Sequence, residues 1–254
     1  MKNRPTHHFF VPNEQIGDRE IVIIESDVNH IKNVLRMTVG EKLTVGDGKN
    51  STEYICEIMK IEENTIRLNI IDRNEAYTEL KSKIYLFQGL PKSDKMELII
   101  QKAVELGVSE IIPVVTTRTI VKLDSKKEQS KVKRWNGIAE SAAKQSKRAV
   151  IPEVLASMKF EQALTYAKDK AIKLIPYELA AGMAGTRQVL EQIETGQDIA
   201  IFIGPEGGFA QAEIEKARQE EVIPISLGKR ILRTETAGLT ILSILMYYLE
   251  IQEA

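Results

Sequence analysis

Cysteine and histidine are scarce in this 254-residue chain, which holds one cysteine, Cys56, and three histidines. A single thiol cannot form a disulfide within the chain, and the shortage excludes a zinc site built from several cysteines. No metal site is therefore expected. The same cysteine usage fits a reducing compartment, so the expected location is the cytoplasm.

Long apolar runs and a charge imbalance are also missing. The longest apolar stretch, residues 238–251, is too short to span a bilayer and predicts a buried helix. The N-terminus shows no apolar segment typical of a secretory signal. With 35 Lys and Arg against 36 Asp and Glu the net charge is -1, so any nucleic-acid site has to be a local basic patch.

Neither of the common phosphate-binding glycine motifs, GxGxxG and GxxxxGK[ST], occurs in the sequence, which makes a polyphosphate ligand a poor expectation. Glycine instead interrupts two other segments: residues 201–208 read IFIGPEGG, and residues 226–237 read SLGKRILRTETA. Each follows an apolar run typical of a buried strand and precedes a helical pattern. Such loops at the carboxyl ends of neighbouring strands predict a ligand site, although an ordinary strand–helix turn is the alternative.

Residues 1–72 are dominated by short, β-rich segments, and the turn at residues 46–48 separates two of them. One helix interrupts them, with Ile31, Val34 and Leu35 as its apolar stripe. This pattern predicts a small β-barrel with one helix, followed by a polar linker over residues 72–83. The expected strands are residues 20–24, 42–45, 53–58 and 65–71.

From residue 84 onward, strand and helix patterns alternate, which predicts an α/β domain over residues 73–254 with a mostly parallel sheet and helices on both faces. Asp94 and Glu97 are expected to cap one helix, and Gly107 to end it. Trp135 is expected to pack rather than to stack on a base. The expected strands are residues 84–87, 110–115, 172–176, 199–203 and 222–227, and the expected helices follow Asp94 and cover about 125–147, 159–169, 185–194, 210–220 and 236–251.

The second glycine loop carries cations and apolar residues together. Ile231 and Leu232 stand among Lys229, Arg230 and Arg233. An apolar wall flanked by donors suits an adenine with a polar sugar edge. In the alternative interpretation, Arg230 and Arg233 pair with Glu235 and Glu206 at the surface.

IGPEGGF and LGKRILRTETA together resemble the SPOUT class of RNA methyltransferases, in particular the 16S rRNA (uracil(1498)-N3)-methyltransferase family. Residues 30–36, 95–107 and 139–148 also match, so the resemblance runs from about residue 7 to about residue 248. It implies a trefoil knot over about residues 174–254, a PUA-like N-terminal barrel that binds RNA, S-adenosyl-L-methionine as the cofactor, and a homodimer. Carried over residue by residue, the cofactor-binding positions are Pro176, Glu178, Ile203, Gly204, Gly208, Ser226, Leu227, Gly228, Ile231, Leu232 and Thr236.

The residues expected to face RNA are basic. Between Lys122 and Arg148 lie nine Lys or Arg and three Asp or Glu, a run that suits phosphates but is also typical of a solvated helix face. The sequence departs from the family at His8, where an arginine usually precedes the aromatic pair. The expected RNA-binding residues are Arg36, Lys92, Lys95, Lys144 and Arg148.

The resemblance implies methylation of N3 of a uridine in 16S rRNA of the small ribosomal subunit. Because N3 carries a proton, the reaction needs a proton acceptor or a cation that stabilises the uracil anion. Arg233 is the candidate cation, and Glu206 and Glu235 are the candidate bases. The alternatives are a related SPOUT enzyme acting on another RNA and a ribosome-assembly factor that binds RNA without catalysis.

Overall fold

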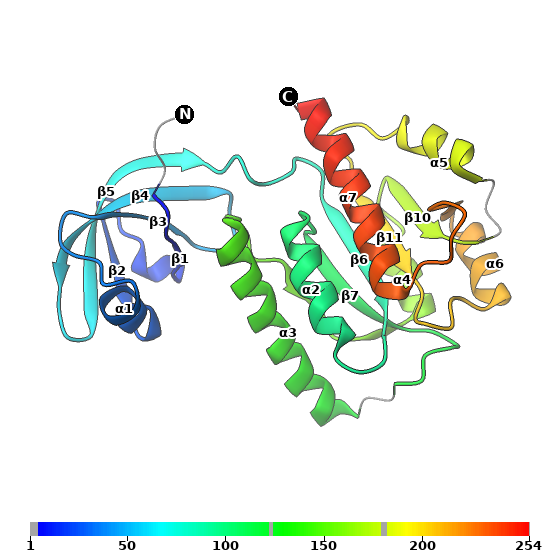
Figure 1. The fold of residues 1–254 in the computed structure, drawn as a ribbon, viewed down its shortest axis with the longest axis horizontal. Coiled ribbons are helices and arrows are strands. Elements are labelled where there is room, and N and C mark those ends of the chain that lie inside the picture. The colour runs from blue at the N-terminus through cyan, green and yellow to red at the C-terminus, as the bar shows by residue number, and fades with distance from the viewer. Residues whose placement is uncertain (1–4, 122–123, 179–181, 254) are drawn as a thin grey trace. The chain divides into compact units, whose positions relative to one another are not determined.

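The computed structural model describes residues 5–121, 124–178 and 182–253 (Figure 1). The chain divides into two compact units. Unit 1 comprises Met1–Glu79 and Ala143–Ile151, and unit 2 comprises Leu80–Ala142 and Pro152–Ala254. No helix within these described ranges is long and apolar enough to cross a membrane.

Unit 1 is built on a five-stranded sheet in the order β1-β3-β4-β5-β2. The pairs are antiparallel except for β1 and β3, which run parallel. Alternate residues of the strands point into one apolar core, where Leu43, Ile58 and Leu68 are almost completely buried. The strands predicted in this region are confirmed; β1 was not predicted. The strands are β1 His8–Phe10, β2 Glu20–Ile24, β3 Lys42–Gly46, β4 Thr52–Ile61 and β5 Thr65–Glu75.

The helix of unit 1 departs from the predicted pattern. It begins as α1, Ser26–Asn29, and continues as a π-helical segment, His30–Val34. Ile31 is fully buried as expected, but Val34 is 62% exposed, so its assignment to the apolar stripe was wrong. A π-helix takes more residues per turn than an α-helix, which rotates Val34 away from the core.

The predicted boundary at residue 72 falls inside β5, because this strand continues to Glu75. Residues 143–151, which were expected in the second domain, belong to unit 1. Two contacts hold this segment there: Arg148 pairs with Glu79 at 2.6 Å, and the Ile151 N–H donates to the Gly48 carbonyl at 2.8 Å. Long-range contacts of this kind leave no periodic pattern in a sequence.

Unit 2 contains a parallel sheet in the order β12-β10-β11-β6-β7-β8, with β9 paired to β7. The mostly parallel sheet is confirmed; β8 and β9, of two residues each, were too short to predict. β10 lies between β11 and β12, so the two glycine loops follow strands that are not neighbours in the sheet. The strands are β6 Ile84–Gly89, β7 Glu110–Val115, β8 Glu153–Val154, β9 Met158–Lys159, β10 Ile172–Pro176, β11 Ile199–Ile203 and β12 Ile223–Ile225.

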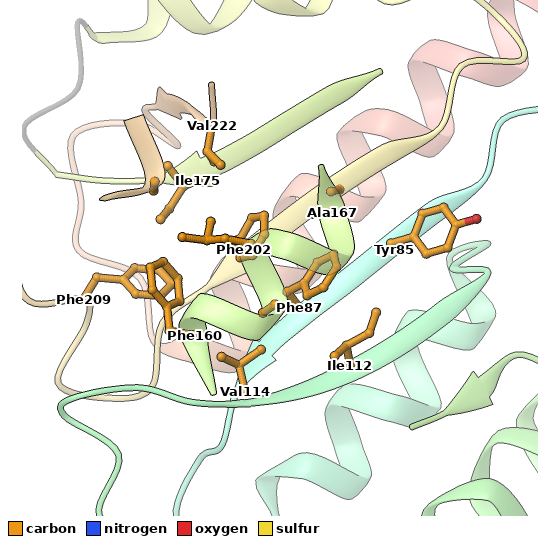
Figure 2. Close-up of a cluster of buried hydrophobic side chains, with 14 of the residues drawn as sticks. Tyr85, Phe87, Ile112, Val114, Phe160, Ala167, Ile175, Phe202, Phe209 and Val222 are labelled. Carbon is orange, nitrogen blue, oxygen red and sulfur yellow. The ribbon is translucent and has the colours of Figure 1, made fainter. Parts of the chain in front are cut away.

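Helices cover both faces of this sheet. On one face, Phe87 and Phe202 stack with ring centroids 4.5 Å apart, and Phe160 of α4 packs edge-on against Phe202 (Figure 2). Ile214 and Ala217 of α6 complete this cluster. α2 and α7 pack together over the other face, where Gly238 of α7 lies against Gln88 and Ile203. The helices are α2 Lys95–Glu105, α3 Ser125–Ser146, α4 Phe160–Ala167, α5 Gly182–Leu190, α6 Gln211–Gln219 and α7 Thr234–Glu253.

Two details of the helix predictions have different outcomes. Gly107 ends α2 with a positive φ of 87°, as predicted, and Trp135 packs with only 2% exposure. The capping pair at the start of α2 is wrong: the Asp94 side chain makes no cap hydrogen bond, and Glu97 instead pairs with Arg134 at 2.8 Å.

Candidate functional site

The site lies at the carboxyl ends of β6, β10, β11 and β12, where the order of the strands along the chain reverses. Gly204 and the four residues after it form a loop directly behind β11. The loop presses so closely on the end of β6 that a Cβ on Gly89 would lie 2.6 Å from the Pro205 nitrogen. Only glycine permits that approach, so the end of β6 sets the position of the loop.

A buried hydrogen-bonded chain joins this loop to the start of α7. Gln88, fully buried, donates from Nε2 to the Thr234 hydroxyl at 2.9 Å. Thr234 in turn donates to the Gly204 carbonyl at 2.6 Å. β6, the first glycine loop and the end of the second are thereby held together by side-chain hydrogen bonds.

Two adjoining hollows open between these elements. One of about 470 Å³ lies over the first loop, Gly204–Gly208, and the other of about 280 Å³ lies beside the second loop, residues 226–232. They share Pro176, Tyr177, Glu178, Ile231, Leu232 and Ala237. Together they form one cavity, called the site cavity below.

The site cavity brings together every predicted cofactor-binding residue except Thr236. Thr236 is exposed and lines neither hollow, because on α7 the inward positions are Thr234 and Ala237. The pattern of polar residues could not distinguish Thr234 from Thr236. Cofactor binding by the residues that line the site cavity remains a prediction.

Of the three candidate catalytic residues, Glu206 and Arg233 line the site cavity and Glu235 does not, and Lys95 joins the two glutamates. Lys95 Nζ lies 3.1 Å from Glu206 Oε1 and 3.4 Å from Glu235 Oε2. The Glu206 carboxylate also accepts the Lys92 N–H at 3.1 Å. Arg233 lines the cavity and is exposed. The alternative in which Arg230 and Arg233 pair with Glu206 and Glu235 has no support in the described part of the chain.

These contacts shift the pKa values of Glu206 and Lys95. Partial burial opposes ionisation of Glu206, yet its own backbone N–H, Lys95 and the Lys92 N–H outweigh burial and lower the pKa of the carboxyl. The hydrogen bond to Glu206 raises the pKa of Lys95. Both groups are therefore charged at neutral pH, and Glu206 is a weak proton acceptor.

The predicted RNA-binding residues do not share one environment. Lys95 lines the site cavity, and Lys92 contacts Glu206 through its backbone. In unit 1, Arg36 is exposed with a left-handed φ of 54°, and Lys144 lies 3.8 Å from Asp27. Lys122, the first member of the basic run, lies outside the described residues.

Arg148 requires a correction. Its side chain is 6% exposed, and Nη2 pairs with Glu79 at 2.6 Å. The same carboxylate accepts the backbone N–H groups of Ala149 and Val150. A guanidinium buried in this ion pair holds unit 1 together and cannot reach a phosphate.

Arg118 lines the site cavity, and sequence reasoning missed it. It follows β7, and its Nη1 donates to the Gly207 carbonyl at 2.7 Å. A lone arginine after a strand carries no signal in one sequence. The position of the strand end in the parallel sheet was the only available indication.

Comparisons with known proteins cover nearly the whole chain. The family model for an RNA methyltransferase domain matches residues 78–246, and the model for an RNA methyltransferase PUA domain matches residues 23–71. Ribosomal RNA small subunit methyltransferase E of Bacillus subtilis is 36% identical over 232 residues, which is 90% of each chain. The protein of that name from Mesomycoplasma hyopneumoniae is 33% identical over 243 residues, 93% of this chain and 97% of its own.

Solved structures agree with these matches. Ribosomal RNA small subunit methyltransferase E from Neisseria gonorrhoeae, bound to S-adenosyl methionine, superposes with a TM-score of 0.82 at 30% identity, over 95% of this chain and 97% of that one. A methyltransferase from Legionella pneumophila in complex with the cofactor SAM superposes with a TM-score of 0.81 at 32% identity and the same coverage.

Proposed function

Since this chain belongs to the RNA methyltransferase family, we propose that it methylates N3 of one uridine in 16S ribosomal RNA, with S-adenosylmethionine as the methyl donor. The observation that carries the proposal is the site cavity, formed by both glycine loops at the carboxyl ends of the parallel strands. Its relatives that were solved with this cofactor superpose over 95% of the chain.

The residues of the site cavity fit the cofactor. Gly208 and Gly228 adopt positive φ values of 65° and 113°, and a Cβ on either would meet nothing within 4 Å, so their backbone faces open space. The second loop would hold the adenosyl part between apolar walls, with Ile231 and Leu232 among them. The first loop would hold the methionine part. When bound, the cofactor supplies a methyl group on a cationic sulfur that leaves as a neutral thioether.

The protein has to position the target uracil and provide an acceptor for its N3 proton. Uracil N3 must lose its proton before or while its electron pair bonds to carbon. Glu206 and Glu235 both remain candidate proton acceptors. Glu206 lines the site cavity and is held ionised by Lys95 and the Lys92 N–H. Glu235 lines neither hollow, and its buried Oε2 lies 3.4 Å from Lys95 Nζ. Arg233 remains a candidate cation, and Thr236 a candidate contact to the cofactor.

The same proposal includes a knot in unit 2, an RNA-binding barrel in unit 1 and a homodimer. Insertion of β10 between β11 and β12 is consistent with a trefoil knot over about residues 174–254. The strand-rich unit 1 and its matching PUA domain model support a PUA-like barrel that binds RNA, with Arg36 and Lys144 among the contacts. We also propose that the protein is cytoplasmic and forms a homodimer. The dimer is supported by α7, which is apolar nearly all round yet exposes Tyr247 and Ile251.

The test uses small ribosomal subunits from a strain that lacks this gene. Incubation with the purified protein and radiolabelled S-adenosylmethionine should label 16S rRNA, and mass mapping should locate one N3-methyluridine. Label on a ribose or on another RNA would support the related-enzyme alternative. Isothermal titration addresses the alternative of a non-catalytic assembly factor, because a protein that does not bind S-adenosylmethionine cannot be the enzyme.

A further inference from the structure

Arg118 is a cation that the proposed chemistry has not yet used. It projects from the turn after β7 and lines the site cavity beside the first glycine loop. One of its N–H groups is donated to the Gly207 carbonyl at 2.7 Å. A guanidinium has five N–H donors in a planar fork, so this contact orients the group and leaves the other donors available.

Several hydrogen bonds hold the turn that carries Arg118 in place. The Thr116 N–H donates to the Thr119 hydroxyl at 2.9 Å, and the Thr119 N–H donates to the Thr116 carbonyl at 3.1 Å. The Thr117 N–H donates to Glu213 at 2.8 Å, and the second oxygen of that carboxylate accepts the Ala210 N–H at the start of α6. Glu213 is only 6% exposed. The exposed Arg118 therefore lies on a turn whose backbone is fixed by the buried Glu213. A rigid backbone of this kind is typical of a ligand-binding residue.

The other two cations that line the larger hollow, over the first glycine loop, are in different situations. Lys95 is compensated by two carboxylates. Arg233 makes no ion pair or side-chain hydrogen bond within the described ranges, so no contact of either kind there fixes its guanidinium. Arg118 likewise has no carboxylate partner in the described part of the chain, but its guanidinium is oriented by Gly207. It is the one of these three that combines an uncompensated charge with a fixed position.

Resting on the proposed function, we infer that Arg118 binds a carbonyl oxygen of the target uracil and stabilises the charge that forms there. The N3 position is flanked by two carbonyl groups, and loss of the N3 proton spreads negative charge over their oxygens. A guanidinium aimed at such an oxygen favours the uracil anion over the neutral base. The proton goes to the acceptor, and the N3 electron pair becomes available for the new N–C bond.

The experiment compares Arg118→Gln and Arg118→Lys with the wild type. Arg187→Gln is the control, because Arg187 is an exposed arginine of α5 that pairs with Glu191 and does not line the site cavity. Affinity for S-adenosylmethionine is measured by calorimetry. The single-turnover methylation rate on unmethylated small subunits is measured as a function of pH.

Arg118→Gln should bind the cofactor within about 2-fold of the wild type and methylate roughly 10²–10³-fold more slowly at neutral pH. This defect should shrink as the pH approaches the N3 pKa of free uridine, because the base then ionises unaided. Arg118→Lys should recover part of the rate. The inference is overturned by an unchanged rate, by a defect that does not vary with pH, or by an equal loss of cofactor affinity, which would mean that Arg118 only braces the loop. A wild-type protein that labels no subunit RNA would instead refute the underlying function.

Discussion

At the scale of single residues, the Thr234 hydroxyl connects the two loops that line the site cavity. It accepts from Gln88 and donates to Gly204, and both partners lie at the end of a buried strand. Removing this hydroxyl takes one partner from the buried Gln88 amide, which keeps its bond to the Gly89 carbonyl, and takes the donor from the partly buried Gly204 carbonyl.

We therefore expect Thr234→Val, which keeps the shape and loses the hydroxyl, to lower the free energy of unfolding by about 1–3 kcal/mol. Affinity for S-adenosylmethionine should fall by about tenfold, since ~1.4 kcal/mol of lost loop ordering corresponds to that factor. Thr234→Ser should behave like the wild type. Thr240→Val is the matched control, because the hydrogen bond of the Thr240 hydroxyl is exposed and, among the described residues, goes only to the Thr236 carbonyl of its own helix. Chemical denaturation and calorimetry measure the two effects; equal behaviour of both valine variants would contradict the assignment.

His8 gives a second prediction at this scale, on pH. Its ring nitrogens are buried without hydrogen-bond partners among the described residues, and burial, with Lys144 nearby, lowers its pKa to about 4 from 6.5. The unfolded chain binds a proton near pH 6.5, whereas the native state does so only near pH 4. Stability is thus fully present above pH 6.5 and is lost as the pH falls toward 4.

Across that window the wild type should lose up to ~3 kcal/mol of unfolding free energy relative to His8→Phe. Urea unfolding at several pH values measures the difference between the two proteins. Parallel pH profiles would show that the imidazole is not buried in its neutral form.

At the scale of elements, an ion pair decides to which unit the end of α3 belongs. Arg148 follows this helix and is buried against Glu79, which also accepts two backbone N–H groups. Removing one partner of a buried pair leaves an uncompensated charge, whereas an exposed pair contributes little.

Arg148→Met should therefore destabilise the protein by about 3–5 kcal/mol. Arg134→Met, which breaks an exposed pair between Arg134 of α3 and Glu97 of α2, should cost at most ~1 kcal/mol. The double variant Glu79→Leu with Arg148→Met should regain only part of the loss, because the Ala149 and Val150 N–H groups lose their acceptor. Thermal and urea unfolding distinguish this structural role from a phosphate contact, which would change RNA affinity and leave stability unaltered.

At the scale of the whole molecule, the apolar surface of α7 remains to be accounted for. Tyr247 and Ile251 are 67% and 57% exposed on a helix that also packs against α2. An apolar helix exposed on one side is typical of a subunit interface.

If this surface forms the proposed homodimer, Tyr247→Glu should shift the protein from dimer to monomer in light scattering and reduce methylation. Met59→Glu, at a 42% exposed apolar position on β4 of unit 1, is the control and should leave the mass unchanged. A wild-type protein that is monomeric at micromolar concentration would refute the dimer.

Much of this molecule could be predicted from local patterns. Apolar runs bounded by glycine and polar residues located the main strands of unit 2, and the two glycine loops located the site cavity. Both signals are local, because strand burial and backbone freedom depend on the residues of the segment itself. The resemblance of those loops to a known family added the cofactor and the reaction.

The tertiary structure decided which charges meet. Lys95, which was expected to face RNA, pairs with Glu206 and Glu235, and Arg148 is buried against Glu79. It also placed β10 between β11 and β12, so that four strand ends rather than two neighbours build the cavity. Arg118 and Thr234 acquired partners 89 and 30 residues away in the chain. The order of strands in a sheet and the pairing of distant side chains depend on long-range contacts, which the periodicity of a single sequence does not record.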